Sequence, residues 1–233
     1  MDLIKAINNA IETRTKRDTR SYIGASSIGN PCLRAIWYGY KGYESGGFPT
    51  STQITFDIGK SLEELLLDYI ELSGIKVERA NEANDFLKCA HAKIKEFQGH
   101  MDGLIHEEND SPIILDIKTA KASSFNVFKK DGLEKWSKIY YSQMQSYMGM
   151  TGYHRAIILA INKDSSELHM EWVYFDEDYY SLISEKAQYI KTQTEPPARI
   201  NNNSCFYMCS RCVFKNVCHY KEEVKEELFE VNI

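Results

Sequence analysis

Apolar side chains recur at helical spacing through the first third of the chain. Residues 2–12 form one amphipathic pattern, and Ser26 and Ser27 can cap a second helix that includes Pro31 in its early turns. The expected buried face of this second helix is Leu33, Ile36 and Trp37. Residues 42–51 are rich in Gly and Ser and predict a loop, and residues 52–72 predict a long helix that ends at Gly74.

The period of the pattern then changes to that of strands. We predict strands over residues 75–79, 86–90, 92–106 and 113–119. Helical spacing returns at residues 139–150, and it is followed by two strands at 153–161 and 168–175 and a helix at 176–194. This α-β-β-β-α-β order predicts an α/β fold in which a mixed sheet is flanked by helices.

Two acidic residues and a lysine stand on two of these predicted strands. Asp116 and Lys118 share one face of their strand because residues i and i+2 project to the same side, and Asp102 lies on the strand before it. Such charges are costly in a core unless a cation or a phosphate compensates them. Carboxylates suit Mg²⁺ or Mn²⁺, and a nearby lysine can orient the attacking water in phosphodiester hydrolysis. A partly exposed Asp–Lys pair is the structural alternative.

The two helices beside these strands add candidate residues. Gly59 and Glu63 lie one turn apart on the long helix, and Gln143 and Tyr147 share one face of the later helix. The alternative for the long helix is that Glu63 and Glu64 form a solvated pair. The alternative for Gln143 and Tyr147 is ordinary helix packing.

Taken in order, these pieces resemble the PD-(D/E)XK nuclease superfamily, and in particular its RecB-like exonucleases. The matching positions are Gly59 with Glu63, Gly99 with Asp102, Asp116 with Lys118, and Gln143 with Tyr147. The resemblance implies a restriction-endonuclease-like core and a DNA exonuclease that acts on single strands or DNA ends. Phage recombination exonucleases of this superfamily carry Glu at the helix position, where many RecB-like members carry His.

The resemblance also implies a role for each residue. Glu63, Asp102 and Asp116 would hold Mg²⁺ or Mn²⁺ together with the carbonyl of Ile117, and Glu64 is an alternative helix ligand. Lys118 would position the water and stabilise the developing negative charge. Gln143 and Tyr147 would shape the site beside the substrate strand.

Four of the six cysteines, namely Cys205, Cys209, Cys212 and Cys218, fall within fourteen residues. Thiolates at this spacing bind zinc or an iron–sulfur cluster, so these four could form a zinc site. Alternatively, Cys32 in Cys32-Leu33-Arg34 replaces Cys205. This second arrangement resembles the CRISPR-associated RecB-like exonucleases and AddB-type nuclease domains, and it implies that a 4Fe-4S cluster joins the N- and C-terminal segments. Cys89 is expected to be a buried strand residue.

Composition supports a soluble globular protein and limits how DNA could be bound. The chain has 233 residues, 43% of them hydrophobic and 26% charged, and a net charge of −5, so DNA contact requires local basic patches. Lysines gather after the strand that carries Asp116: Lys118, Lys121, Lys129, Lys130, Lys135 and Lys138. Arg14, Lys16, Arg17 and Arg20 form a second basic cluster. Phe125, Phe128 and Trp136 could stack on bases or pack a solvated loop.

These observations predict a single nuclease domain over residues 1–233. We expect its core at about 52–195 and its cluster-binding segments at about 26–40 and 205–220. The chain has neither an apolar run of membrane-spanning length nor a signal-peptide core, which predicts no membrane association and a cytoplasmic location in a bacterial, archaeal or phage-infected cell.

The expected partner is DNA, with a helicase, an annealing protein or a CRISPR protein possible beside it. The alternative functions are a catalytically silent DNA-binding or assembly module and an endonuclease of the same fold.

Overall fold

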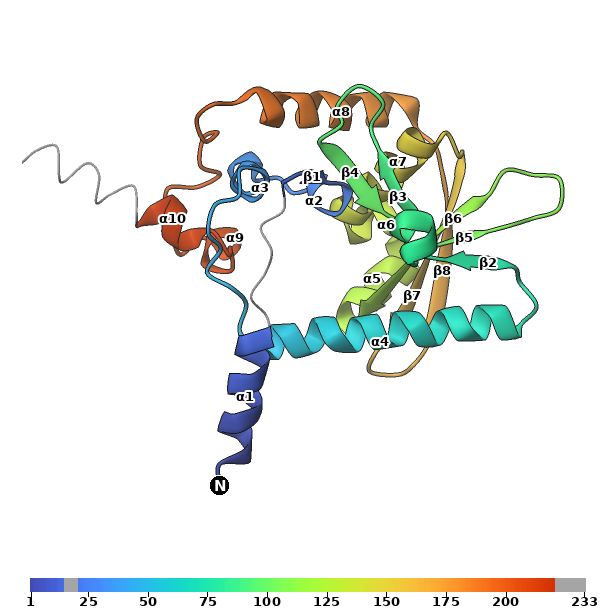
Figure 1. Cartoon of the computed structure of the whole chain (residues 1–233), viewed down its shortest axis with the longest axis horizontal. Helices are drawn as coiled ribbons and strands as arrows, with labels where there is room; N and C mark the ends of the chain where they lie inside the picture. The colour runs from blue at the N-terminus through green and yellow to red at the C-terminus, as the bar shows by residue number, and fades with distance from the viewer. Residues whose placement is uncertain (15–20, 221–233) are drawn as a thin grey trace, which may run out of the picture. The chain divides into compact units, whose positions relative to one another are not determined.

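The computed structural model describes residues 1–14 and 21–220 (Figure 1). The chain divides into two compact units. One unit comprises residues 1–22, 31–57 and 193–233, and the other comprises residues 23–30 and 58–192. Three members of the predicted basic cluster, Lys16, Arg17 and Arg20, lie outside the described residues.

The unit formed by residues 23–30 and 58–192, hereafter the sheet unit, contains two sheets. The larger has the strand order β2-β5-β6-β7-β8, and its neighbours are antiparallel except for the parallel pair β6 and β7. Its strands are β2 (Val77–Arg79), β5 (Gly103–Ile105), β6 (Ile113–Ala120), β7 (Arg155–Asn162) and β8 (Leu168–Tyr174). The smaller sheet has the order β1-β4-β3, with β1 (Ile23–Gly24), β3 (Lys88–Ala90) and β4 (Phe97–His100).

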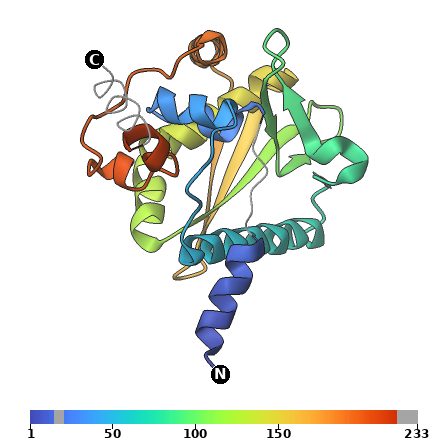
Figure 2. The same cartoon turned by 60° about the vertical axis from the view of Figure 1, so that its left-hand side comes forward.

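Helices cover both faces of the larger sheet, which confirms the predicted mixed α/β class. The long helix α4 (Thr50–Leu72) extends across one side of the strands (Figure 2). Its Leu66 and Leu67 pack in one buried cluster with Leu115, Ile117 and Ile161 of the sheet. The other helices of the sheet unit are α2 (Ala25–Ile28), α5 (Ala122–Asp131), α6 (Leu133–Trp136), α7 (Lys138–Thr151) and α8 (Glu177–Thr192). A 3₁₀ segment, η1 (Glu82–Leu87), precedes β3.

The helix predicted to begin at Ser26 is wrong as a single element. The structure has α2 in the sheet unit and, after a break, α3 (Leu33–Tyr40) in the other unit, with Cys32 as the extended N-cap residue of α3. Pro31 lies in the break, because a proline disfavours helical backbone at the residue before it. The predicted burial of Ile36 and Trp37 is confirmed, whereas Leu33 is half-buried.

The lysine-rich segment after β6 is helical rather than a loop. Phe125 and Phe128 of α5 are fully buried, so they pack the fold and are not free to stack on bases. Trp136 of α6 stacks on Phe128 with ring centroids 4.5 Å apart, and its Nε1 donates a hydrogen bond to Ser124 Oγ at 2.7 Å. Lys129 forms an ion pair with Glu167, so it is not a free cation for phosphate.

The unit formed by residues 1–22, 31–57 and 193–233, hereafter the terminal unit, has short elements. Its helices are α1 (Leu3–Arg14), α3, the start of α4, α9 (Tyr207–Ser210) and α10 (Lys215–His219). Segments far apart in sequence are tied together here: Trp37 Nε1 donates to the carbonyl of Gln193 at 3.0 Å, and the Gly46 amide donates to the carbonyl of Val213 at 2.7 Å. Among the described residues, no helix has both the length and the apolar character needed to cross a membrane.

Candidate active site

Strand β6 carries two charged residues into the interior of the sheet unit. Leu115 and Ile117 face the α4 cluster, so the alternation of the strand turns Asp116 and Lys118 to the opposite face. Asp116 is 0% exposed, and the Nζ of the largely buried Lys118 lies 2.5 Å from its Oδ2. Apart from this ion pair, within the described part of the chain both carboxylate oxygens of Asp116 lack a hydrogen-bond partner. Asp116 therefore presents a buried charge that its surroundings compensate incompletely.

Lys118 is held from a second side by an aromatic ring that the sequence reasoning missed. Its Nζ lies 5.2 Å from the ring centroid of Tyr140 in the first turn of α7. Burial lowers the pKa of Lys118, but the charges of Asp116 and Asp102 outweigh burial and raise it above its usual value. The side chain is thus a fixed ammonium. Tyr140 lies three residues before Gln143 on the same predicted helix, and this helical spacing could have indicated that Tyr140 faces the site.

Asp102 lies between two sheets rather than within a strand. The strand predicted over residues 92–106 is wrong as one element, because the chain leaves the smaller sheet after β4 and enters the larger one at β5. Asp102 occupies this transition, and its Oδ2 accepts a hydrogen bond from the Ile117 amide at 2.8 Å. The last β5–β6 pair is Gly103 with Leu115, so the Asp102 carboxylate bonds the amide just beyond the end of the ladder. This bond brings the second carboxylate beside β6.

Glu63 of α4 completes the group, and Glu64 does not. Burial and, to a smaller extent, the nearby charge of Asp102 raise the pKa of Glu63 to about 7 against the lowering effect of Lys118. Glu64 is exposed and lies 3.8 Å from Arg79 of β2. Burial likewise raises the pKa of Asp116, against the lowering effect of Lys118. The charge of Asp102 thus acts on the pKa of Glu63, Asp116 and Lys118, which places the four groups near one another.

Gln143 and Tyr147 support this group from α7. Gln143 Nε2 donates to Tyr147 Oη at 2.7 Å, and Tyr147 Oη donates to the carbonyl of His100 at 2.5 Å, two residues before Asp102. Tyr147 is buried, which raises its pKa well above the usual value, so its hydroxyl remains protonated and able to donate. A Cβ added at Gly99 would lie 2.5 Å from Tyr147 Cε1, so the glycine makes room for this ring. Both residues thus fix the strand that leads to Asp102.

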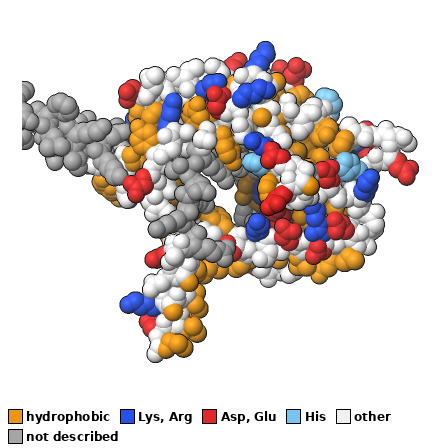
Figure 3. Space-filling model, in the orientation of Figure 1, with side chains coloured by type: hydrophobic (Ala, Val, Ile, Leu, Met, Phe, Trp, Pro, Cys, Tyr) orange, Lys and Arg blue, Asp and Glu red, His pale blue; other side chains and the backbone are white. Residues whose placement is uncertain are grey.

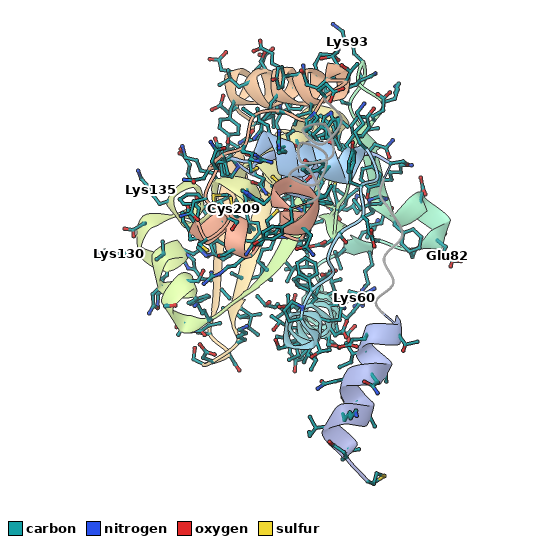
Figure 4. The ribbon with its side chains drawn as sticks, turned by 90° about the vertical axis from the view of Figure 1, so that its left-hand side faces the viewer. Lys60, Glu82, Lys93, Lys130, Lys135 and Cys209 are labelled. Carbon is teal, nitrogen blue, oxygen red and sulfur yellow. The ribbon has the colours of Figure 1, made fainter. Side chains whose placement is uncertain are left out.

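The cysteines of the terminal unit gather without forming a finished metal site. Burial raises the pKa of Cys212, and the neighbouring thiols of Cys32, Cys218 and Cys209 raise it further. Arg34 Nη1 lies 3.9 Å from Cys218 Sγ. In Figure 4, the labelled Cys209 lies among the short red helices of this unit. Cys205 is exposed, and Cys89 is buried on β3 as predicted.

Across residues 1–14 and 21–220, no group of three or more His, Cys, Asp or Glu side chains has an arrangement that could hold a metal ion as it stands. This holds for the carboxylates and for the thiols. Both predicted ligand sets, the carboxylates and the thiols, therefore stay predictions.

The fold is similar to that of several solved structures, among them an alkaline exonuclease. Over 80% of this chain and 90% of the other, it resembles the alkaline exonuclease LHK-Exo from Laribacter hongkongensis, with 14% identity and a TM-score of 0.54. The same enzyme in complex with dAMP gives 15% identity and a TM-score of 0.56 over the same shares. SSO0001 gives 14% identity and a TM-score of 0.56 over 94% of this chain and 96% of that chain. These likenesses confirm the restriction-endonuclease-like fold.

Sequence comparison identifies the family. No curated protein sequence matches the chain. Residues 16–154 match the family described as the YqaJ-like viral recombinase domain, and this range includes Glu63, Asp102, Asp116, Lys118, Gln143 and Tyr147. The predicted nuclease superfamily is thereby supported, while the finer resemblance to iron–sulfur nucleases stays a prediction. Because the match spans more than half of the 233 residues, the chain belongs to the YqaJ-like viral recombinase family.

Proposed function

We propose that the protein is a metal-dependent DNA exonuclease that acts on single strands or DNA ends. The family match and the fold shared with an alkaline exonuclease support a nuclease. The observation that carries the proposal is Asp116, whose two buried oxygens lack hydrogen-bond donors and whose charge is only partly met by Lys118. A buried carboxylate of this kind, beside two further carboxylates, fits a divalent cation.

Mg²⁺ or Mn²⁺ would be held by Glu63, Asp102 and Asp116, with the Ile117 carbonyl as a fourth group. In an extended strand the amide and carbonyl of one residue point to the same side, and the Ile117 amide already points to Asp102. The Ile117 carbonyl therefore lies on the same edge of β6, beyond the end of β5. When bound, the ion supplies a Lewis acid for the phosphate and an acidified water.

Lys118 supplies the fixed positive charge of the reaction. Because its pKa is raised, it does not act as a base at neutral pH, and its ammonium orients the water and stabilises the negative charge that develops on phosphorus-bound oxygen. Asp116 and Tyr140 hold it from two sides. Gln143 and Tyr147 act on Asp102 through the His100 carbonyl rather than on the substrate.

The test is degradation of end-labelled linear DNA with Mn²⁺, compared with a closed circle. We expect the native protein to shorten linear DNA from its ends, to leave the circle intact and to lose activity in a chelator. Lys118→Ala should lower the rate by about 10²-fold or more, because one fixed group that stabilises transition-state charge is worth that much.

Lys93→Ala is the matched control, since Lys93 is an exposed lysine in the loop between β3 and β4, outside both basic clusters. It should keep the native rate. Undiminished activity in Lys118→Ala, with unchanged circular dichroism, would contradict the assignment. Cleavage of the circle would instead indicate the endonuclease alternative.

We also propose that Cys32, Cys209, Cys212 and Cys218 hold a 4Fe-4S cluster. The support is that Cys32 has the largest effect among the thiols that raise the pKa of Cys212, whereas Cys205 is exposed and is not among them. The competing arrangement is a zinc ion at Cys205, Cys209, Cys212 and Cys218. Anaerobically purified protein should be brown, and Cys32→Ser should abolish the colour. Colourless protein with one zinc per chain would favour the competing site.

A further inference from the structure

Three consecutive residues before strand β3 have a backbone conformation that is rare outside glycine. The φ angles of Asp85, Phe86 and Leu87 are 51°, 53° and 48°, so all three lie in the left-handed region. This region is unfavourable for residues with a side chain, because Cβ comes too close to the following carbonyl oxygen. Backbone strain of this kind gathers at functional sites, where the surrounding structure maintains it.

Neighbouring groups hold the strained segment in place. The Phe86 amide donates a hydrogen bond to the carbonyl of Asn81 at 2.7 Å, and Asn84 Nδ2 donates to Glu78 Oε1 at 3.0 Å. Leu87 is buried, whereas Phe86 is 49% exposed. The segment thus keeps a large aromatic ring partly in solvent, although burial of apolar surface would favour turning it inwards.

The exposed Phe86 lies opposite Asp102 of the candidate active site. Strands β3 and β4 pair in antiparallel register up to the first residue of β3. One step beyond, the Met101 amide donates to the carbonyl of Leu87 at 3.3 Å, and continuing this register places Phe86 opposite Asp102. The strained segment therefore stands where the chain leaves the smaller sheet and delivers a carboxylate to the larger one.

Two basic side chains lie next to this position. Lys88 of β3 and His100 of β4 are opposite one another in register, so their side chains share one face of the sheet, and both residues are exposed. The next pair, Cys89 with Gly99, is turned to the interior, where a Cβ on Gly99 would meet the ring of Tyr147. By strand alternation, Lys88 and His100 point to solvent.

The charges around Phe86 indicate what each side chain could bind. Glu82 and Asp85 are exposed beside the ring and would repel a phosphate there, whereas Lys88 and His100 could contact one. A nucleobase carries no charge and can stack on an aromatic ring whatever its sequence. Figure 3 shows acidic, basic and histidine side chains close together on this face of the sheet unit, around the position of η1 in Figure 1.

We propose that Phe86 stacks on an unpaired base of the DNA strand that enters the candidate active site, and that Lys88 and His100 contact the adjoining phosphate. These three residues are hereafter the base-stacking site. The inference rests on the proposed nuclease function and adds the part of the substrate that is recognised. Because stacking is open to every base, the base-stacking site selects unpaired ends without reading their sequence.

The first test measures DNA binding separately from cleavage. Protein in a chelator is titrated with a fluorescent oligonucleotide that has an unpaired end, and anisotropy gives the affinity. Phe86→Ala should weaken binding by about 10-fold or more, as expected when one base-stacking ring is removed, and Phe86→Trp should keep the native affinity. Native affinity in Phe86→Ala would overturn the proposal.

The phosphate contact is tested in the same assay at several salt concentrations. Lys88→Ala should lower the slope of log affinity against log salt by about one, because one phosphate contact is lost. Lys93→Ala is the matched control and should change neither affinity nor slope, since Lys93 is an exposed lysine at the other end of the β3–β4 hairpin. In Figure 4, Lys93 lies far from Glu82, the first residue of η1.

A comparison of two variants separates stacking from a structural role. Glycine adopts the left-handed conformation without strain, so Phe86→Gly should be more stable to urea than Phe86→Ala, the reverse of the usual order. Both variants should nevertheless lose DNA affinity to the same extent. Affinity that follows stability across the two variants would show a structural role and overturn the proposal.

The last test removes the base instead of the ring. An abasic nucleotide is moved along the unpaired end, and at one position native binding should fall to that of Phe86→Ala, which should itself lose nothing further there. Equal losses in both proteins at every position would overturn the proposal. The Mn²⁺-dependent cleavage rate of Lys118→Ala is measured in parallel: an undiminished rate there contradicts the nuclease function, whereas native affinity in Phe86→Ala overturns the base-stacking site alone.

Discussion

Two carboxylates of the candidate active site lie on long secondary-structure elements, whereas the C-terminal cysteines lie on or beside very short helices. Glu63 and Asp116 lie within a 23-residue helix and an eight-residue strand, and buried apolar neighbours hold both elements. Cys209 and Cys218 lie on helices of four and five residues, which are too short to be stable by themselves. The sheet unit therefore positions its charged groups through core packing, whereas the thiols of the terminal unit lie on short helices that the proposed cluster would hold. The predictions that follow test this difference, from the largest expected effect to the smallest.

Asp116→Asn should separate activity from stability. The amide keeps the shape of the side chain but removes the charge that a cation requires, so the rate of DNA degradation should fall by about 10²–10³-fold. The metal-free protein should change little in stability, because loss of a buried carboxylate without hydrogen-bond donors is offset by loss of the charge that compensates the buried ammonium of Lys118. The rate assay and urea unfolding in a chelator measure the two effects. Equal losses of both would show that the charge is structural.

Cys212→Ser should have the reverse effect. If a cluster holds the terminal unit, this change should remove bound iron and lower the thermal midpoint substantially, because structural metal binding supplies folding free energy. Cys205→Ser is the control, since Cys205 is exposed. Iron content, visible absorbance and thermal unfolding are the measurements. If only Cys205→Ser lowers metal content, the zinc arrangement gains support.

Gly99→Ala should show how tightly the sheet unit is packed around Asp102. The added Cβ would lie 2.5 Å from Tyr147 Cε1 and 2.8 Å from Ala25 Cβ, and overpacking of this kind costs about 1–3 kcal/mol. Thermal or urea unfolding measures the loss. Tyr147→Leu in the same chain should restore part of it, whereas Tyr147→Phe, which keeps the ring, should not. Additive effects of the two changes would contradict direct contact between the glycine and the ring.

The smallest effect concerns pH. The pKa of Glu63 is raised from 4.5 to about 7 by burial, so between these values the folded state binds a proton that the unfolded state has released. The free energy of unfolding of the metal-free protein should therefore fall as pH rises from 4.5 through 7. Glu63→Gln should make this decline shallower, and saturating Mn²⁺ should offset it most strongly above pH 7. Urea unfolding at several pH values gives the slopes, and identical slopes in Glu63→Gln would refute the link.

Regular elements with a strong pattern could be predicted from the sequence. The shared face of Asp116 and Lys118 follows from strand alternation, and helix α7 ends where Gly152 adopts a φ of 79° that favours glycine. The pairing of Gln143 with Tyr147 follows from helical spacing, and the structure joins them by a hydrogen bond. In each case local geometry determines the relation.

Relations set by tertiary structure could not be predicted in this way. Buried residues continue to alternate around Met101, so the sequence pattern does not show that the chain changes sheets there. The hydrogen bond at this point, from the Ile117 amide to Asp102, joins residues fifteen apart in the sequence. Helix α5 was not predicted in the lysine-rich segment after β6, although Phe125 and Phe128 are three residues apart, which is helical spacing. Charge suggested a loop there, but the burial of two aromatic rings determined the outcome.

The hydrogen bond between Asp102 and the Ile117 amide has a consequence for coordination number. One oxygen of this carboxylate accepts a hydrogen bond from the backbone, so the other oxygen, Oδ1, would be the better donor atom for an ion. Small, hard ions such as Mg²⁺ accept this readily because they keep several waters in an octahedral shell. If an ion binds here, a carboxylate that contributes a single oxygen would leave room for water and for a phosphate oxygen of the proposed substrate.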